Sequence, residues 1–199
     1  MIELPDGVRL VLASASPRRS ELLRSVGLDF EVVPADIDES VLAGEKPAAY
    51  VARLSVEKAR VVVERLGSPS IVVAADTTVD VDGHILQKPV DDDDVRRMLG
   101  LLSGRVHLVH TGVTVVGSTG GAPGASESVV VETAVEFVAM TPDVVDWYVG
   151  TGEPFGKAGA YAIQGAGGAL VRRLDGSVTN VIGLPLAETL DLIARRPNL

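Results

Sequence analysis

Hydrophobic and polar positions follow two periodicities along this chain. Short apolar runs, typical of buried strands, stand between longer stretches in which apolar residues recur at helical spacing. Strands are expected at residues 8–12, 30–34 and 71–75. Helices are expected at residues 17–26, 47–66 and 92–102. Strands that alternate with helices in this order predict an α/β protein.

The second half of the chain contains two β-branched, apolar segments, residues 106–116 and 129–138. Glycine and other small residues dominate the sequence between them, so we expect a long hairpin with a flexible tip at about residues 117–127. A last helix is expected at about residues 185–195. The length of residues 1–199 is near the upper end for one compact domain, and it also allows two lobes that share a sheet.

Composition narrows the class of protein. Cysteine is absent, which excludes disulfide frameworks, cysteine-type zinc sites and thiol catalysis, and which fits a reducing cytoplasm. The first residues lack a basic segment followed by an apolar core, and no stretch holds eighteen uninterrupted apolar residues. We therefore expect a cytoplasmic protein without a signal peptide or a membrane span.

The charge of the chain bears on its partners. The formal net charge is −9 at pH 7, which creates a long-range field that repels DNA and RNA. Only 4% of the residues are aromatic, so stacking surfaces for single-stranded nucleic acid are scarce. Nucleic acid is therefore not an expected partner. A small phosphorylated ligand is compatible with this charge, because salt screens distant charges within ~10 Å and local cations dominate at short range.

The most informative segment is residues 14–19, Ser-Ala-Ser-Pro-Arg-Arg, between the first expected strand and the first helix. Pro17 suits the first helical position, and a helix start presents free N–H groups and the positive end of the helix dipole. Arg18 and Arg19 add guanidinium groups, whose planar fork matches phosphate oxygens. This combination favours an anion site. The alternative is two solvated arginines in a first turn, where the dipole works against them.

Acidic candidates follow two of the expected strands. Asp76 comes after the buried run of residues 71–75, so we expect it where a central strand ends, the usual place for a ligand in open α/β sheets. A carboxylate there can hold a divalent cation or accept a proton from water, whereas the alternative is a turn or a backbone cap. The other carboxylates that supply hard oxygen donors for magnesium or manganese are Asp36, Asp38 and Glu39.

Two further segments suit a nucleotide ligand. Lys88 precedes Pro89, which restricts the lysine backbone, as would suit a cation aimed at a phosphate; a lysine at such a place is otherwise simply exposed. Residues 156–165 are rich in glycine and alanine, and such small residues allow a backbone to approach a ligand closely. Gln164 offers both a donor and an acceptor to the edge of a base, although a lone glutamine is also common on a surface.

Several other patterns do not indicate a site. His107 and His110 are three residues apart in an expected strand, so they lie on opposite faces and do not share a metal ion. The acidic run of residues 91–94 begins a helix, where negative charge complements the dipole, and is interpreted as structural. No phosphate-binding P-loop, dinucleotide fingerprint or serine–histidine–acid arrangement is present in the sequence.

Six short motifs occur here in the order found in the Maf family, and together they span nearly the whole chain. They are residues 14–19, 57–59, 75–77, 87–89, 157–165 and 183–185. The sequence resembles the branch described as dTTP/UTP pyrophosphatases, because residues 161–164 carry a Tyr-x-Ile-Gln signature that the sister branch for 7-methyl-GTP lacks.

The resemblance implies an α/β fold in which two lobes surround an elongated mixed sheet flanked by helices, with a cleft between the lobes. It implies a hydrolase acting on the α–β phosphoanhydride of dTTP, UTP and modified pyrimidine nucleotides, with a nucleoside monophosphate and diphosphate as products. It also implies a divalent cation, Mg²⁺ or Mn²⁺, as cofactor, a role in removing unwanted nucleotides, and a homodimer.

The resemblance also assigns roles to single residues. Asp76 matches the proton acceptor that activates water, and Glu39 together with Asp76 matches the metal-binding carboxylates. Arg18, Thr77 and Gln164 match the positions associated with selection of the base. The remaining members of the expected substrate-binding set are Ser14, Arg19, Lys58 and Lys88.

Two departures from the family pattern bear on selectivity. Gly156 replaces an acidic residue and Ala162 replaces a glycine, which can change the rigidity of this loop. Two alternative functions stay open at this point: a nucleotide-binding regulator of cell division with little turnover, and a pyrophosphatase of the 7-methyl-GTP type.

Overall fold

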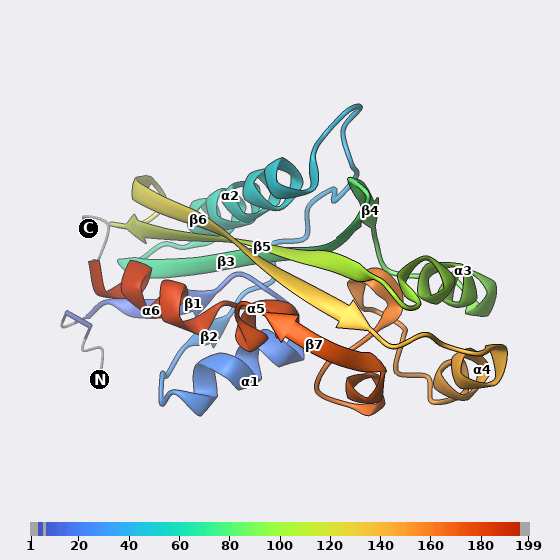
Figure 1. Cartoon of the computed structure of the whole chain (residues 1–199). Helices are drawn as coiled ribbons and strands as arrows, with labels where there is room; N and C mark the ends of the chain where they lie inside the picture. The colour runs from blue at the N-terminus through green and yellow to red at the C-terminus, as the bar shows by residue number, and fades with distance from the viewer. Residues whose placement is uncertain (1–3, 6, 196–199) are drawn as a thin grey trace.

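A curled, seven-stranded mixed sheet forms the centre of the computed structural model, which describes residues 4, 5 and 7–195 (Figure 1). The strands are β1 (Arg9–Leu12), β2 (Glu31–Val32), β3 (Ser70–Val81), β4 (His84–Leu86), β5 (Val106–Ser118), β6 (Pro123–Phe137) and β7 (Val171–Asp175). The helices are α1 (Pro17–Ser25), α2 (Pro47–Arg65), α3 (Asp92–Leu102), α4 (Pro142–Gly150), α5 (Val178–Ile182) and α6 (Leu186–Arg195). Two short 3₁₀ helices are η1 (Ala158–Ala160) and η2 (Ala166–Leu170).

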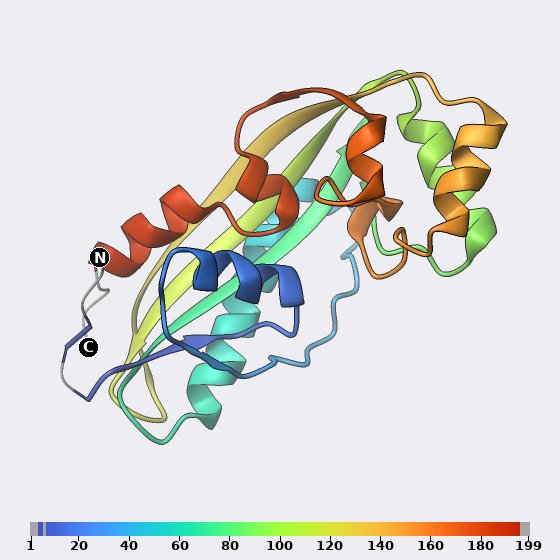
Figure 2. The ribbon, with the colours of Figure 1, turned by 90° about the horizontal axis from the view of Figure 1, so that it is seen from below.

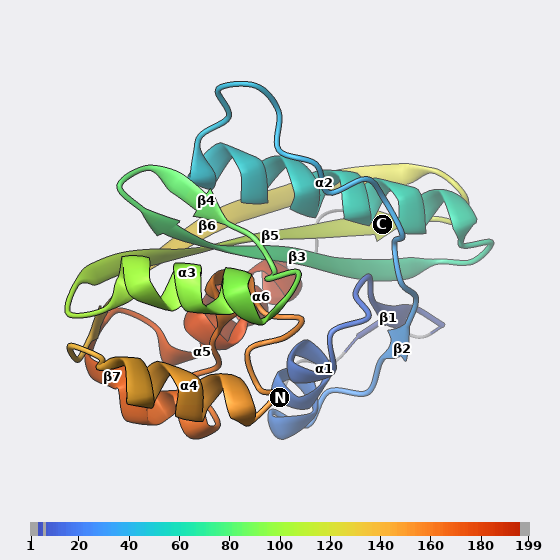
Figure 3. The ribbon, with the colours of Figure 1, turned by 90° about the vertical axis from the view of Figure 1, so that its right-hand side faces the viewer.

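The helices cover both faces of the sheet. Its strand order is β2-β1-β3-β5-β6-β7, with β1 parallel to β2 and β3 and with antiparallel pairing from β3 to β7. Helix α2 lies along one face, and α1, α5 and α6 lie along the other (Figures 1 and 2). Helices α3 and α4 pack together at one end of the sheet (Figure 3). The predicted α/β class, with a mixed elongated sheet between helices, is confirmed.

Alternation along β3 explains how both faces become buried. Val72 packs in the core under α2, whereas Ile71 and Val73 pack in the core under α1 and α6. This is the period-two pattern of a strand with both faces covered. Helix α2 approaches the sheet closely at Gly112, where an added Cβ would lie 2.3 Å from the Val51 carbonyl oxygen.

One edge of β3 is only partly paired, and the unpaired stretch borders a cavity. β1 pairs with residues 70–73 of β3, and β4 pairs with residues 79–81. In the described part of the chain, residues 74–78 have a strand partner only in β5, on the opposite edge. We call residues 74–78 the open edge of β3.

The expected end of β3 is wrong. The sequence suggested that the strand stops at Ala75 and leaves Asp76 at its end, but β3 continues to Val81 and Asp76 lies in its middle. The β-branched residues at positions 77, 78, 79 and 81 favour the extended conformation, and pairing with β5 continues to Asp80. A ligand crevice beside Asp76 is therefore formed by the open edge, and not by the end of a strand.

The expected helices agree closely with the structure, whereas the expected hairpin turn is too long. The predicted helices at residues 17–26, 47–66 and 92–102 correspond to α1, α2 and α3 within one residue at each end. The hairpin turn is shorter than residues 117–127, because β5 extends to Ser118 and β6 begins at Pro123. The Ser118 hydroxyl donates to the Ala122 carbonyl and accepts from the Gly120 N–H, which closes the turn.

The two histidines of β5 lie on opposite faces, as predicted from their spacing. His107 contacts Tyr161, whereas His110 contacts Asp80 and Glu132. None of the helices in residues 4, 5 and 7–195 combines the length and the apolar character needed to cross a bilayer.

Candidate active site

A cavity of about 940 Å³ lies beside the open edge of β3. Its wall includes the segment between β1 and α1, the loop before α2, α2 itself, and the loop that contains η1. All nine residues selected from the sequence line this one cavity: Ser14, Arg18, Arg19, Glu39, Lys58, Asp76, Thr77, Lys88 and Gln164. The structure therefore brings the candidates together, while their individual roles stay predictions.

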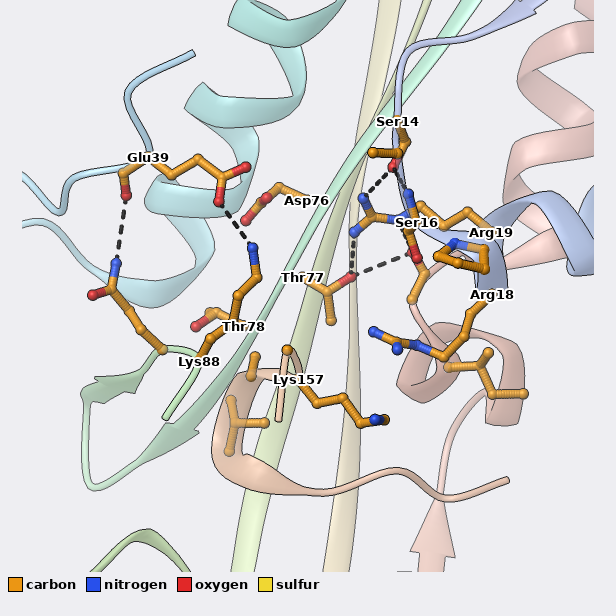
Figure 4. A pocket seen from close by; sticks show the side chains of 18 of the residues that line it. Ser14, Ser16, Arg18, Arg19, Glu39, Asp76, Thr77, Thr78, Lys88 and Lys157 are labelled. Carbon is orange, nitrogen blue, oxygen red and sulfur yellow. Dashed lines mark hydrogen bonds and ion pairs between the residues drawn. The ribbon is translucent and has the colours of Figure 1, made fainter. Parts of the chain in front are cut away.

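Asp76 and Thr77 point to different faces of the sheet, yet both reach the cavity because the open edge lies between them. Asp76 faces α2, where Lys58 meets it, and Thr77 faces α1, where Arg19 meets it. Figure 4 shows the two resulting groups, with Glu39 and Lys88 on one side of β3 and Ser14, Arg18 and Arg19 on the other.

The first group is an ion-pair network around Lys58, on α2. Its Nζ lies 2.6 Å from Asp76 Oδ1 and 2.5 Å from Glu39 Oε1. Lys88 Nζ lies 3.3 Å from Glu39 Oε2 at the solvent side. The side chains of Lys58 and Asp76 are each only 9% exposed. A buried ion pair of this kind depends on both partners, because removal of one leaves an uncompensated charge.

Glu39 is held by its backbone as well as by these lysines. Its carbonyl accepts hydrogen bonds from the Tyr50 hydroxyl at 2.9 Å and from Gln87 Nε2 at 3.4 Å. Burial raises the pKa of Glu39, but hydrogen bonds and charges from Lys58 and Lys88 outweigh this effect and hold the pKa below its usual value. Glu39 is therefore a carboxylate at neutral pH.

The second group is centred on Arg19, which is buried. Arg19 Nε donates to the Gly183 carbonyl at 2.7 Å, Nη1 donates to Ser14 Oγ at 3.0 Å, and Nη2 donates to Thr77 Oγ1 at 3.1 Å. Burial lowers the pKa of Arg19 from its usual value, and the Asp76 charge opposes that change. Arg19 uses three of its five N–H donors within the protein, so it fixes the segment before α1 while keeping donors for a ligand.

Arg18 and Lys157 place two less constrained cations near this group. Burial lowers the pKa of both residues, and the nearby Arg18 charge lowers that of Lys157 further. Lys157 Nζ donates to the carbonyls of Glu153 and Phe155. Lys157 belongs to a motif noted in the sequence but was not among the selected site residues. The sequence signal that could have identified Lys157 is a single lysine within a run of glycine and alanine.

The glycines of residues 156–165 have a different explanation from the expected one. A Cβ at Gly159 would lie 2.6 Å from Val79 Cγ2, and a Cβ at Gly165 would lie 1.8 Å from Glu153 Oε2. Gly159 therefore allows the loop to pack on β3, and Gly165 allows it to pack on the Glu153 carboxylate. Gly156 has open space around it and lines the cavity. The ligand-facing members of the loop include Lys157 and Gln164.

Two carboxylates at this site could take part in binding a cation. Asp76 and Glu39 already share the positive charge of Lys58, which shows that both reach one point. Within residues 4, 5 and 7–195, no group of three or more histidine, aspartate or glutamate residues is arranged to hold a metal ion alone. Mg²⁺ is commonly bound by one or two carboxylates together with substrate phosphates, and the donor set here fits that pattern. Asp38 is engaged elsewhere, since its Oδ1 accepts from Ser40 N and Oγ.

The fold and the site together define an α/β protein with a cavity suited to a small, highly charged anion. The chain belongs to the Maf family, because residues 9–196 match the sequence pattern described as "Maf-like protein". It is 54% identical to the dTTP/UTP pyrophosphatase of Anaeromyxobacter dehalogenans over 187 residues, which cover 94% of this chain and 93% of that protein. It is 50% identical to the dTTP/UTP pyrophosphatase of Myxococcus xanthus, with 96% and 93% coverage.

The chain also matches the solved structure of the nucleoside-triphosphatase, or dITP/XTP pyrophosphatase, of Mycobacterium abscessus. Its TM-score is 0.43 at 18% identity, over 96% of this chain and 94% of that one.

Proposed function

We propose that this protein is a nucleoside triphosphate pyrophosphatase. It hydrolyses dTTP and UTP to a nucleoside monophosphate and inorganic diphosphate. Relatives that are 50–54% identical and carry that name support the proposal. The observation that carries it is the ion pair of Asp76 with Lys58 on the open edge of β3, in a cavity whose wall also holds cations from three other parts of the chain: Arg18 and Arg19, Lys88, and Lys157.

The cations have a direct electrostatic purpose in this reaction. A triphosphate carries several negative charges, and the charge on the leaving diphosphate grows as the anhydride bond breaks. Lys58, Lys88 and Arg18 line the cavity and can stabilise that charge at short range. Their effect is large because part of the wall is buried, where the effective dielectric constant is lower than in water.

Asp76 is the proton acceptor in the proposed mechanism. The ion pair with Lys58 fixes Oδ1, and no hydrogen bond to Oδ2 is present among the described residues. Oδ2 can accept a proton from a water molecule as that water attacks the α-phosphorus, in line with the oxygen that bridges the α- and β-phosphates. The phosphorus–oxygen bond to the diphosphate then breaks, and the electron pair leaves with the diphosphate.

A divalent cation fits beside this carboxylate. Glu39 and Asp76 would hold it together with phosphate oxygens, and when bound it would supply charge neutralisation at the triphosphate.

Selection of the base is assigned to three residues of the cavity wall. Gln164 can donate to and accept from the edge of a pyrimidine, and Arg18 and Thr77 line the same space. Thr77 is held by Arg19 and by the Thr111 hydroxyl at 2.9 Å, so its position is fixed before a ligand arrives.

Asp76→Asn tests the proposal. The amide keeps the size of the side chain but cannot accept the proton, so we expect kcat for dTTP to fall about 10²- to 10⁴-fold. Turnover is measured as released diphosphate, with Mg²⁺ or Mn²⁺, in parallel with a panel of purine triphosphates and 7-methyl-GTP. Asp38→Asn is the matched control, since Asp38 also lines the cavity but caps a turn, and we expect near-normal turnover.

The same panel separates the alternatives. A nucleotide-binding regulator would bind dTTP and release no diphosphate, and a 7-methyl-GTP enzyme would prefer that nucleotide over dTTP. Full turnover by Asp76→Asn would contradict the proposed mechanism.

A further inference from the structure

His107, on β5, is a buried histidine outside the cavity wall. Only 2% of its surface is exposed, and it lies among the rings of Phe137 and Tyr161. The ring centroids of His107 and Phe137 are 4.8 Å apart, those of Phe137 and Tyr161 are also 4.8 Å apart, and all three contacts are edge-to-face. An apolar residue of similar shape would fill this space, so the polar atoms of His107 require an explanation.

The explanation lies in a single hydrogen bond. His107 Nε2 and the Tyr161 hydroxyl are 2.8 Å apart, and no other side-chain hydrogen bond to either residue is present in the described chain. Burial lowers the pKa of His107 to about 4, so the ring is neutral at physiological pH. His107 Nδ1 is buried without a hydrogen-bond partner among the described residues. The pair therefore keeps one hydrogen bond at the cost of an unsatisfied atom.

Tyr161 follows a strained piece of backbone. Gly159 has φ +69°, and Ala160 has φ +60°, a value that residues with a side chain seldom adopt. Such a conformation persists only where the surrounding structure enforces it. Several attachments do so here: the Gly159 N–H donates to the Gln87 carbonyl at 3.2 Å, the Ala160 N–H donates to the Lys157 carbonyl at 3.1 Å, and Tyr161 is held by His107.

The strained piece stands between the two ligand-facing parts of the loop. Lys157 precedes it and Gln164 follows it, and both line the cavity. The backbone runs from Tyr161 through Ala162, whose N–H donates to the Tyr148 hydroxyl at 3.1 Å, to Gln164. Release of the Tyr161 side chain from His107 would free one of the two holds on this segment and let Gln164 move relative to Asp76. This effect on the position of Gln164 comes from the neutral His107–Tyr161 hydrogen bond and does not require a charged group.

We propose that His107 and Tyr161 form a positioning pair, which sets the place of Gln164 and thereby the selectivity for pyrimidine over purine triphosphates. This inference rests on the proposed function. His107 is not part of the cavity wall; it acts through Tyr161, which is part of that wall and whose hydroxyl binds His107.

Tyr161→Phe removes the hydroxyl and retains the ring, so it is the mildest test. We expect the ratio of kcat/KM for dTTP to that for dATP to fall about tenfold, through a higher KM for dTTP, with kcat within about twofold of normal. We also expect a lower Tm, because His107 is left buried with two unpaired nitrogens.

The double variant His107→Phe with Tyr161→Phe separates position from stability. Replacing both hydrogen-bond partners by apolar groups of similar shape removes the unsatisfied atoms, so we expect the Tm to return to near the normal value. The selectivity ratio should stay low, because the anchor is still missing. If instead the ratio recovers together with the Tm, the pair is merely structural and the proposal is overturned.

His110→Asn is the matched control. His110 is also a buried histidine of β5, three residues away, but it faces Asp80 and Glu132 on the opposite side of the sheet. The proposal requires an unchanged selectivity ratio in this variant, and an equal fall would contradict it. If the unmodified protein hydrolyses no nucleoside triphosphate, the proposed function and this inference are both overturned. If the unmodified protein is active and Tyr161→Phe leaves the dTTP-to-dATP selectivity ratio unchanged, this inference alone is overturned.

Discussion

At the scale of single residues, the site is organised by Lys58. One ammonium group joins two carboxylates that approach from different segments, Glu39 from a loop and Asp76 from β3. Without a cation at this point, the two carboxylates would repel each other within a partly buried space. Lys58 thus holds the two carboxylates together, and in the proposed function it also lies within the cavity that receives the phosphates.

Lys58→Met measures how much this cation stabilises the fold. Loss of the shared cation leaves Asp76 buried without its partner, so we expect the free energy of unfolding to fall by about 3 kcal/mol. Saturating Mg²⁺ should recover part of this loss in the variant, because binding to the folded chain alone stabilises it. Urea denaturation with and without Mg²⁺ provides the measurement.

Lys88→Met is the control for that experiment. Lys88 also pairs with Glu39, but its side chain is 61% exposed, so we expect a change below about 1 kcal/mol. Equal losses in the two variants would show that burial of Lys58 does not matter for stability.

At the scale of secondary-structure elements, close packing of α2 on the sheet places Lys58 opposite Asp76. Contact is closest at Gly112, where β5 touches the backbone of α2 at Val51. Since Lys58 is two turns further along α2 and Asp76 pairs with Gly112 in the sheet, a shift of the helix would separate the ion pair.

Gly112→Ala tests this coupling. The added Cβ would lie 2.3 Å from the Val51 carbonyl oxygen and would push α2 away from the sheet. We expect the free energy of unfolding to fall by about 1–3 kcal/mol, the usual cost of overpacking, and kcat to fall with it. Gly100→Ala, in α3 with open space around the added Cβ, should instead be stabilising by about 0.5–1 kcal/mol. Chemical denaturation of both variants measures these changes. An unchanged free energy of unfolding in Gly112→Ala would contradict the tight contact between β5 and α2.

The same elements show what the sequence could and could not predict. Helices α1, α2 and α3 were predictable because proline marks the start of α1 and α2, and the Asp91 side chain caps α3 by accepting from Asp94 N at 2.8 Å. The length of β3 was not, because an aspartate is rare inside a strand and here depends on Lys58 from another element. The hydrogen bond of His107 was hidden for a similar reason, since its partner Tyr161 is 54 residues away.

The candidate site was predictable mainly through the ordered motifs. Pattern and charge pointed to single residues such as Arg18, Asp76 and Lys88, but each had an ordinary structural alternative. Only the fold brings them to one cavity, because β1 is shorter than β3 and leaves an edge free. That difference in strand length has no signal in the periodicity of either segment.

At the scale of the whole molecule, acid stability reports on the buried His107. The pKa of His107 is about 4 in the folded chain, because burial disfavours the charged ring, and 6.5 is the ordinary value for an exposed histidine. Between these two values, the unfolded chain binds a proton that the folded chain does not. The contribution of neutral, buried His107 to the free energy of unfolding is therefore fully present above pH 6.5, and it is lost as the pH falls toward 4.

The expected size of the effect is about 3 kcal/mol between pH 7 and pH 4. Carboxylates also contribute to acid unfolding, so the normal chain must be compared with the double variant His107→Phe with Tyr161→Phe, which lacks this titration. Urea denaturation at several pH values should give parallel curves for the two proteins above pH 6.5 and a steeper loss for the normal chain below it. Curves that stay parallel to pH 4 would mean that His107 is accessible to protons in the folded state, and the anchor of Tyr161 would then be open to water as well.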